Sequence, residues 1–212
     1  MIGAAFDHLI VAAATLEQGD AYIEARTGVR PLRGGKHVAM GTHNSVLKLG
    51  PRAYLEVIAI DPQGVAPRRA RWFDLDRPEM QAQLRTCPRL INWAASTTDI
   101  DAVRHACPVD PGPAHAMSRG AFSWRITIPD DGHLPGGGVL PTLIAWSDAR
   151  HPTDTMPDAR VRLATVAAAH PEPTRIRAAL AALGLGAVLK VSFDRQVRLA
   201  AMLHTPRGMV TL

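Results

Sequence analysis

An Ala-rich pattern occurs three times in this chain of 212 residues, and it constrains the fold more than any other feature. Val11-Ala-Ala-Ala-Thr-Leu-Glu17 resembles Trp93-Ala-Ala-Ser-Thr-Thr-Asp99, and both resemble Val166-Ala-Ala-Ala-His-Pro-Glu172. Each copy closes an apolar run and opens a segment with the residue spacing of a helix. Repetition in the same context predicts one supersecondary unit that is built three times.

The first unit covers about residues 4–60 and has the order βαβββ. Alternation places Phe6 and His8 on one face of the opening strand and Asp7 on the other. Thr15 is typical of a helix N-cap, and Gly28 of a helix stop. The predicted elements are a strand at 6–11, a helix at 16–26, a short strand at 29–32, a loop at 33–36, and a hairpin with strands at 43–49 and 53–60.

The rest of the chain divides into a connector and two further units. The connector, about 61–88, carries four prolines, one short helix is predicted near 78–84, and we expect Trp72 and Phe73 to anchor it to the core. The second unit, about 89–148, is predicted to hold strands at 90–95, 122–128 and 139–146 and a helix at 98–106. The third unit lies within 149–212, with strands at 160–168, 188–193, 196–204 and 209–212 and a helix at 173–183. The fold class predicted from this order is α+β with repeated βαβββ modules.

Composition excludes several classes of protein. With 47% hydrophobic and 20% charged residues, the chain has enough apolar surface for a core, and no apolar run reaches the roughly 18 residues of a membrane span. Cys87 and Cys107 have no metal or redox spacing, and the N-terminus lacks the basic start of a signal peptide, so a cytoplasmic protein is expected. The net charge of +5 comes mostly from scattered arginines, which does not favour a nucleic-acid partner.

Seven short motifs follow one another in a specific order along the chain. They are Phe6-Asp-His-Leu-Ile-Val11, Gly41-Thr-His-Asn44, Tyr54-Leu-Glu-Val-Ile-Ala59, Trp124-Arg-Ile-Thr-Ile-Pro129, Pro141-Thr-Leu-Ile-Ala-Trp146, His151-Pro152 and Thr205-Pro-Arg-Gly208. In this order the motifs resemble a known family, the glyoxalase-like domain proteins of the vicinal-oxygen-chelate (glyoxalase/bleomycin-resistance/dioxygenase) superfamily, and the resemblance covers nearly the whole chain. It implies that two βαβββ modules pair around a cavity, while the third, C-terminal module packs on them or at a subunit interface.

In metalloenzyme members of that superfamily, the first and last strands of each module supply metal ligands, commonly His and Glu. The resemblance therefore implies a divalent cation (Zn, Ni, Mn or Fe, not distinguished) on His8 and Glu56, with His43 as a further ligand and Glu56 also catalytic. A buried, ionised Glu on an apolar strand costs several kcal/mol unless it is paired or binds a metal. The plain alternative is that His8 and Glu56 are a hydrogen-bonded pair in the core.

The second unit departs from the family pattern. Its opening strand reads Leu90-Ile-Asn-Trp93 without a His, and Ala145 stands where the carboxylate of the closing strand is expected. Two ligands hold a divalent metal poorly, so a substitute would have to come from His43, Asn92 or His151.

Six residues are candidates for substrate binding. Indole side chains would suit an aromatic or extended apolar ligand, although ordinary packing explains any one of them as well. An arginine that follows a cavity-facing tryptophan points the other way, into solvent, and the reverse assignment would place the cation in the pocket. The six candidates are Asn44, Trp93, Trp124, Arg125, Trp146 and His151.

The function that the sequence favours is a glyoxalase-like enzyme acting on a small molecule. Its chemistry would be that of an isomerase, a lyase or a transferase at adjacent oxygens, with a divalent metal acting as Lewis acid. The alternative is a metal-free protein that binds or sequesters a small molecule, as bleomycin-resistance relatives do, and a third reading is a scaffold whose cavity is filled. The expected partner is a small molecule, neither nucleic acid nor membrane, and a homodimer is compatible with the sequence.

Overall fold

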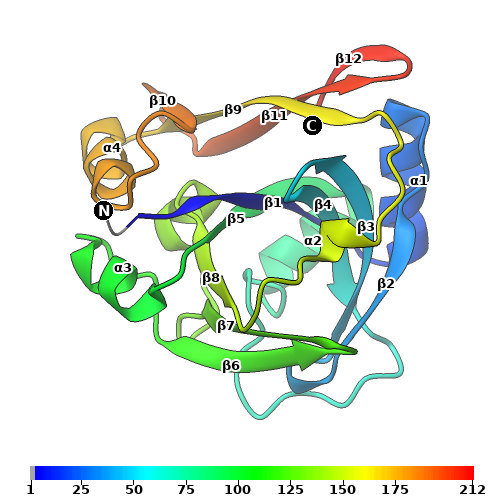
Figure 1. Cartoon of the computed structure of the whole chain (residues 1–212), viewed down its shortest axis with the longest axis horizontal. Helices are drawn as coiled ribbons and strands as arrows, with labels where there is room; N and C mark the ends of the chain where they lie inside the picture. The colour runs from blue at the N-terminus through cyan, green and yellow to red at the C-terminus, as the bar shows by residue number, and fades with distance from the viewer. Residues whose placement is uncertain (1–2) are drawn as a thin grey trace.

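The computed structural model describes residues 3–212 and has the expected α+β architecture (Figure 1). The first module follows the order βαβββ. Thr15 accepts a hydrogen bond from the Gln18 amide at the start of its helix, and Gly28 ends the helix with φ 76°. Residues 33–36 belong to a strand, not to the predicted loop. The elements are β1 (Ala5–Ala12), α1 (Leu16–Thr27), β2 (Leu32–His37), β3 (Thr42–Gly50) and β4 (Ala53–Ile60).

The second module repeats this order after a connector that contains α2 (Pro78–Thr86). Trp72 and Phe73 of the connector are buried, as expected. One strand was not predicted, because Ala114–Arg119 holds none of the β-branched or aromatic residues that mark a strand. The elements are β5 (Arg89–Ser96), α3 (Ile100–Ala106), β6 (Ala114–Arg119), β7 (Phe122–Thr127) and β8 (Thr142–Trp146).

Both modules share one eight-stranded sheet with the order β2-β3-β4-β1-β5-β8-β7-β6. The modules meet where β1 pairs antiparallel with β5. The two end strands, β2 and β6, contact each other, so the sheet curls until it is nearly closed. A cavity can therefore form on its inner face.

The third module forms a second sheet over the outer face of the first. It contains β9 (Arg162–His170), α4 (Pro173–Ala182), β10 (Leu189–Phe193), β11 (Arg198–Thr205) and β12 (Gly208–Thr211), in the sheet order β10-β9-β11-β12. In Figure 1 this sheet is the upper layer, above β1 and β5, with α1 at its right. Val166 and Leu203 of the upper layer share one hydrophobic core with Leu9 and Trp93 of the large sheet.

A β-bulge in β1 changes which side chains face the cavity. The register shifts between Phe6 and His8, so Phe6 lies on the outer face and stacks on Trp93, with ring centroids 6.0 Å apart. Asp7 and His8 consequently contact each other instead of pointing to opposite faces. The alternation predicted for this strand is wrong at these positions, because a bulge adds one residue and resets the period of two. No helix in the described part of the chain is long and apolar enough to cross a membrane.

Candidate functional site

A cavity lies inside the curled sheet, between the two modules and the connector. Its free volume is about 360 Å³ including the open mouth, but only about 20 Å³ takes the centre of a water molecule. That space holds one or two waters, so the walls are close together in this structure. The first module lines it with His8, His37, Tyr54 and Glu56, the connector with Trp72 and Phe73, and the second module with Arg119, Trp124, Ile126, Ile144 and Trp146.

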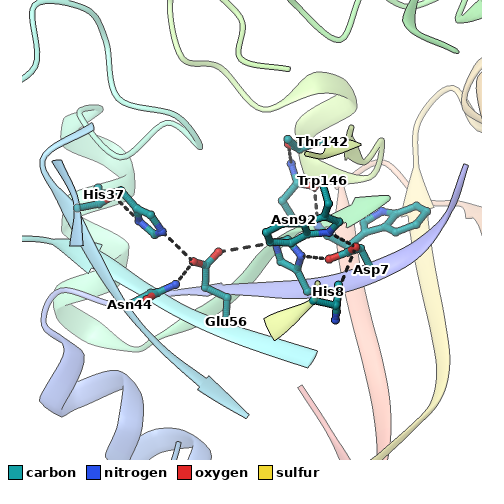
Figure 2. Close-up of polar contacts among 11 residues, drawn as sticks. Asp7, His8, His37, Asn44, Glu56, Asn92, Thr142 and Trp146 are labelled. Carbon is teal, nitrogen blue, oxygen red and sulfur yellow. Dashed lines mark hydrogen bonds and ion pairs between the residues drawn. The ribbon is translucent and has the colours of Figure 1, made fainter. Parts of the chain in front are cut away.

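The Glu56 carboxylate lies at the centre of the polar wall (Figure 2). Asn44 donates from Nδ2 to Glu56 Oε1 at 2.5 Å. The β3–β4 pairing places Ile58 opposite Asn44, so Glu56 is its diagonal neighbour and within reach of the amide. Two imidazole nitrogens face the same carboxylate: His8 Nε2 is 3.8 Å from Oε2, and His37 Nε2 is 3.8 Å from Oε1. One buried carboxylate is thus flanked by two histidines.

His8 is held from behind by Asp7. Its Nδ1 lies 2.7 Å from Asp7 Oδ1, and its ring stacks on Tyr54 with centroids 4.4 Å apart. The other oxygen, Asp7 Oδ2, accepts from Trp146 Nε1 at 2.9 Å and lies 3.4 Å from His151 Nε2. Burial opposes ionisation of Asp7, but hydrogen bonds from His151 and His8 outweigh it and hold the pKa of Asp7 well below its usual range. Asp7 therefore stays charged and fixes the imidazole.

His37 comes from the end of β2, and its ring is buried. Burial lowers the pKa of His37 to about 4, and the attraction of the charged imidazole to Glu56, which raises the pKa, is smaller. The ring is therefore neutral near pH 7. Its Nδ1 lies 3.1 Å from Thr42 Oγ1, and its ring is nearly perpendicular to those of Trp72 and Trp124. A neutral imidazole at this place can exchange a hydrogen bond with a ligand without adding charge.

The second module contributes aromatic walls and one cation. Trp124 and Trp146 lie with ring centroids 5.6 Å apart. Arg119 ends β6 and crosses over β2 at Gly35, where a Cβ atom would come within 2.9 Å of the arginine stem. Glycine at 35 therefore gives Arg119 its room at the cavity.

The structure brings together five of the residues expected at the site. His8, Glu56, Trp124 and Trp146 line the cavity, and Asn44 binds Glu56. A sixth, His151, is fully buried behind the wall, where its ring meets Asp7, Thr153, Tyr54 and Trp146.

Three expected residues lie elsewhere. His43 is next to Asn44 in β3, so alternation turns it to the outer face, where its Nδ1 is 4.0 Å from Asp61. Trp93 is 0% exposed in the outer core, and its Nε1 donates to the Val139 carbonyl. Arg125 forms an ion pair with Asp101 of α3, with N–O distances of 2.6 and 3.1 Å.

Sequence reasoning missed His37 and Asp7 as site residues. Asp7 was placed on the wrong face because the bulge in β1 is not visible in the alternation of residues. His37 directly follows the Gly-rich segment 33–36, which was predicted to be a loop. In a strand at 32–37, His37 lies on the same face as Gly35, and this relation becomes visible only when the segment is known to be a strand.

The donors do not fit the four-ligand metal site of the superfamily. The cavity-facing residues of β8 are Ile144 and Trp146, neither of which binds a metal. The side chain of Asn92 is already used, because its Oδ1 accepts from the Trp93 amide at 2.5 Å and its Nδ2 lies 3.5 Å from Thr142. Within residues 3–212, no group of three His, Cys, Asp or Glu side chains could hold a metal ion. Only His8 and Glu56 of the predicted ligands remain together.

A comparison with a solved structure shows the same fold, and two further neighbours are less similar. A hypothetical protein from Staphylococcus aureus matches with a TM-score of 0.65 and 15% identity, over 93% of this chain and 88% of that one. Methylmalonyl-CoA epimerase from Mycobacterium tuberculosis has a TM-score of 0.42 and 17% identity, over 69% and 89% of the two chains. A mutant of 4-hydroxymandelate synthase from Streptomyces coelicolor has a TM-score of 0.45 and 16% identity, over 100% and 63%.

Sequence comparisons give the family. No curated protein matches the chain. The glyoxalase-like domain matches residues 6–184, which include both paired modules, every residue that lines the cavity and the first half of the third module. The chain therefore belongs to the glyoxalase-like domain family.

Proposed function

We propose that this protein is an enzyme that acts on a small molecule in the cavity, with Glu56 as the proton carrier. The observation that carries the proposal is the buried Glu56 carboxylate, which Asn44 holds on one oxygen and which faces the Nε2 atoms of His8 and His37. A buried carboxylate at a cavity wall is a group suited to general acid–base chemistry. The two free thiols, Cys87 and Cys107, fit the cytoplasmic setting that we propose.

The proposed chemistry is proton transfer at a carbon next to oxygen-bearing carbons. Glu56 takes the proton, and the electron pair left behind moves onto an adjacent oxygen. The neutral His37 ring and the Arg119 guanidinium lie in the same cavity and can stabilise that oxygen. Return of the proton to another carbon gives an isomerase, and loss of a neighbouring group gives a lyase.

A divalent metal acting as Lewis acid would be a more specific form of this proposal, but the metal-binding side chains of the cavity do not support it. Of the predicted ligands only His8 and Glu56 lie in the cavity, and His37 also faces Glu56 there, but no group of three such side chains within residues 3–212 is arranged to hold an ion. The proposed steps therefore use side chains alone. Elemental analysis of the protein and of a His8→Ala, Glu56→Ala variant tests this point. We expect no stoichiometric metal after incubation with excess Zn²⁺, Ni²⁺, Mn²⁺ or Fe²⁺. One ion per chain, lost in the variant, would replace these steps with Lewis-acid chemistry.

The second candidate is a metal-free protein that binds and sequesters a small molecule. The observation that favours it is the wall of Trp72, Trp124 and Trp146, which offers stacking surfaces to a flat ligand. In this reading Glu56 orients the ligand and moves no proton.

One experiment separates the two candidates. The protein is incubated in D₂O with a panel of dicarbonyl, epoxide and diol compounds, and NMR follows the loss of C–H signals and the formation of products. We expect turnover of at least one compound, and a rate that falls about 10²–10⁴-fold in Glu56→Gln. Glu79→Gln, an exposed position in α2, is the control and should keep the wild-type rate. Equal rates for the wild type and Glu56→Gln contradict the enzyme proposal, and binding without turnover favours sequestration.

A further inference from the structure

Three side chains of the cavity wall carry hydrogen-bond donors that have no acceptor within residues 3–212. The indole nitrogens of Trp72 and Trp124 are buried and without a hydrogen-bond partner. The Arg119 guanidinium, which is partly exposed, makes no hydrogen bond or ion pair with the described residues. The other two indoles give the contrast, because Trp93 donates to the Val139 carbonyl and Trp146 donates to Asp7. The unpaired indoles are thus two of the three that line the cavity.

Leaving the two indole N–H groups unpaired is unfavourable, because burial removes their hydrogen bonds to water and supplies none in return. A ligand that brought oxygen atoms would give these two groups a partner and would also pair with the Arg119 guanidinium. The wall itself offers few acceptors: Glu56 is the only carboxylate among the lining residues, and Asn44 already occupies its Oε1. The cavity is therefore rich in donors and poor in acceptors.

From these contacts we infer that the cavity binds a small organic carboxylate, with its carboxylate group on Arg119 and its apolar body against the indole walls. The inference builds on the proposed function and names the class of ligand for that site. Arg119 presents a planar fork that matches a carboxylate. A phosphate, which carries more negative charge, would be bound less well, because Arg119 is the only Lys or Arg among the lining residues.

Binding of anything larger than a water molecule requires the walls to separate, since the cavity now has about 20 Å³ for water centres. The test therefore uses acids of graded size. Propionate, isovalerate and phenylacetate are each compared with the corresponding amide, which has the same body without the charge. Phenethylamine tests the opposite charge. Binding to the full chain is measured by calorimetry, with tryptophan fluorescence as a second readout.

For the wild type, we expect at least one acid to bind tenfold or more tightly than its amide. In Arg119→Gln that preference should vanish. Arg125→Gln is the matched control, since it removes an arginine from the outer face of the neighbouring strand, and it should keep the preference. Trp124→Phe keeps an aromatic ring but removes the N–H, and it should weaken the acid severalfold more than the amide.

A further variant moves Arg119 without changing it. Gly35→Ala introduces a Cβ atom 2.9 Å from Arg119 Cγ and Cδ, and position 35 has a backbone conformation open to alanine. We expect this variant to lose part of the preference for acids. Circular dichroism checks that each variant is folded, and Arg119→Lys, which keeps the charge and loses the fork, should lie between Arg119→Gln and the wild type.

Four results would overturn the inference. They are equal binding of acids and amides, tighter binding of phenethylamine, an unchanged preference in Arg119→Gln, and no binding of any acid. The turnover assay with Glu56→Gln is independent of these results. If Glu56→Gln still prefers acids while no compound is turned over, the ligand class holds and the proposed enzyme activity fails.

Discussion

The two paired modules share a fold but contribute opposite chemistry to the cavity. The first module supplies the ionisable wall, with His8, His37 and Glu56 facing one another. The corresponding wall of the second module is aromatic and aliphatic, and its one charged side chain is Arg119. A repeated βαβββ unit therefore fixes where side chains face the cavity, and leaves each copy free to hold different residues there.

The largest expected effect distinguishes a side chain buried in the core on the outer face of the large sheet from one that lines the cavity on its inner face. Trp93→Ala should destabilise the protein by about 3–5 kcal/mol, because the indole is fully buried among well-packed residues. Trp124→Ala should cost clearly less, because its ring borders the cavity and its N–H makes no hydrogen bond. Urea unfolding of both variants measures the difference. Equal losses would mean that the cavity is packed like the core, which favours a filled scaffold.

The buried histidine of the first module gives a pH-dependent test. Because the pKa of His37 falls from 6.5 to about 4 on folding, the unfolded chain binds a proton that the folded chain excludes. Stability is therefore full above pH 6.5 and is lost as the pH falls toward 4. The loss amounts to about 2 kcal/mol between pH 7 and pH 5. Urea unfolding at both pH values measures it.

His37→Gln is the control for that titration. It should lose less stability than the wild type between pH 7 and pH 5, because the remaining histidines with lowered pKa values, His43 and His115, are far more exposed. Asp7 does not interfere, since its lowered pKa affects stability only below about pH 4. An identical pH dependence in His37→Gln and the wild type would show that His37 is already protonated or solvated in the folded chain.

The smallest effect is expected at the outer surface of the second module. Arg125 pairs with Asp101 in solvent, and exposed ion pairs contribute little to stability. Arg125→Gln should leave the thermal midpoint and ligand binding unchanged. A clear loss of binding would place Arg125 at the site after all and weaken the contrast between the two faces of β7.

The order of elements could be predicted from the sequence because its signals are local. The Thr15 cap, the Gly28 stop and the repeated Ala-rich pattern each depend on neighbouring residues. Which side chains meet in the cavity depends on strand pairing instead. The bulge in β1 moved Phe6 to the outer face, and alternation in β3 allowed only one of His43 and Asn44 to face Glu56.

The position of Arg119 at the site was even harder to predict from the sequence. Arg119 belongs to a strand that the composition of 114–119 did not predict, and it reaches the cavity only because the end strands β2 and β6 approach each other. That approach depends on the curvature of the whole sheet. Sequence patterns identified His8, Asn44 and Glu56, which lie on the long strands of the first module, and missed His37, which ends the weakly marked strand β2.

The second sheet has a consequence for how the chain could be shortened. Every residue that lines the cavity precedes position 149, so a fragment ending at 148 would keep the lining and lose, of the predicted site residues, only His151, which contacts Asp7 from behind. It would also leave Leu9, Val11 and Trp93 without the cover that Val166 and Leu203 now provide. Contiguous apolar surface of this kind drives self-association. Solubility, more than chemistry, is thus what the C-terminal sheet would supply to the two modules beneath it.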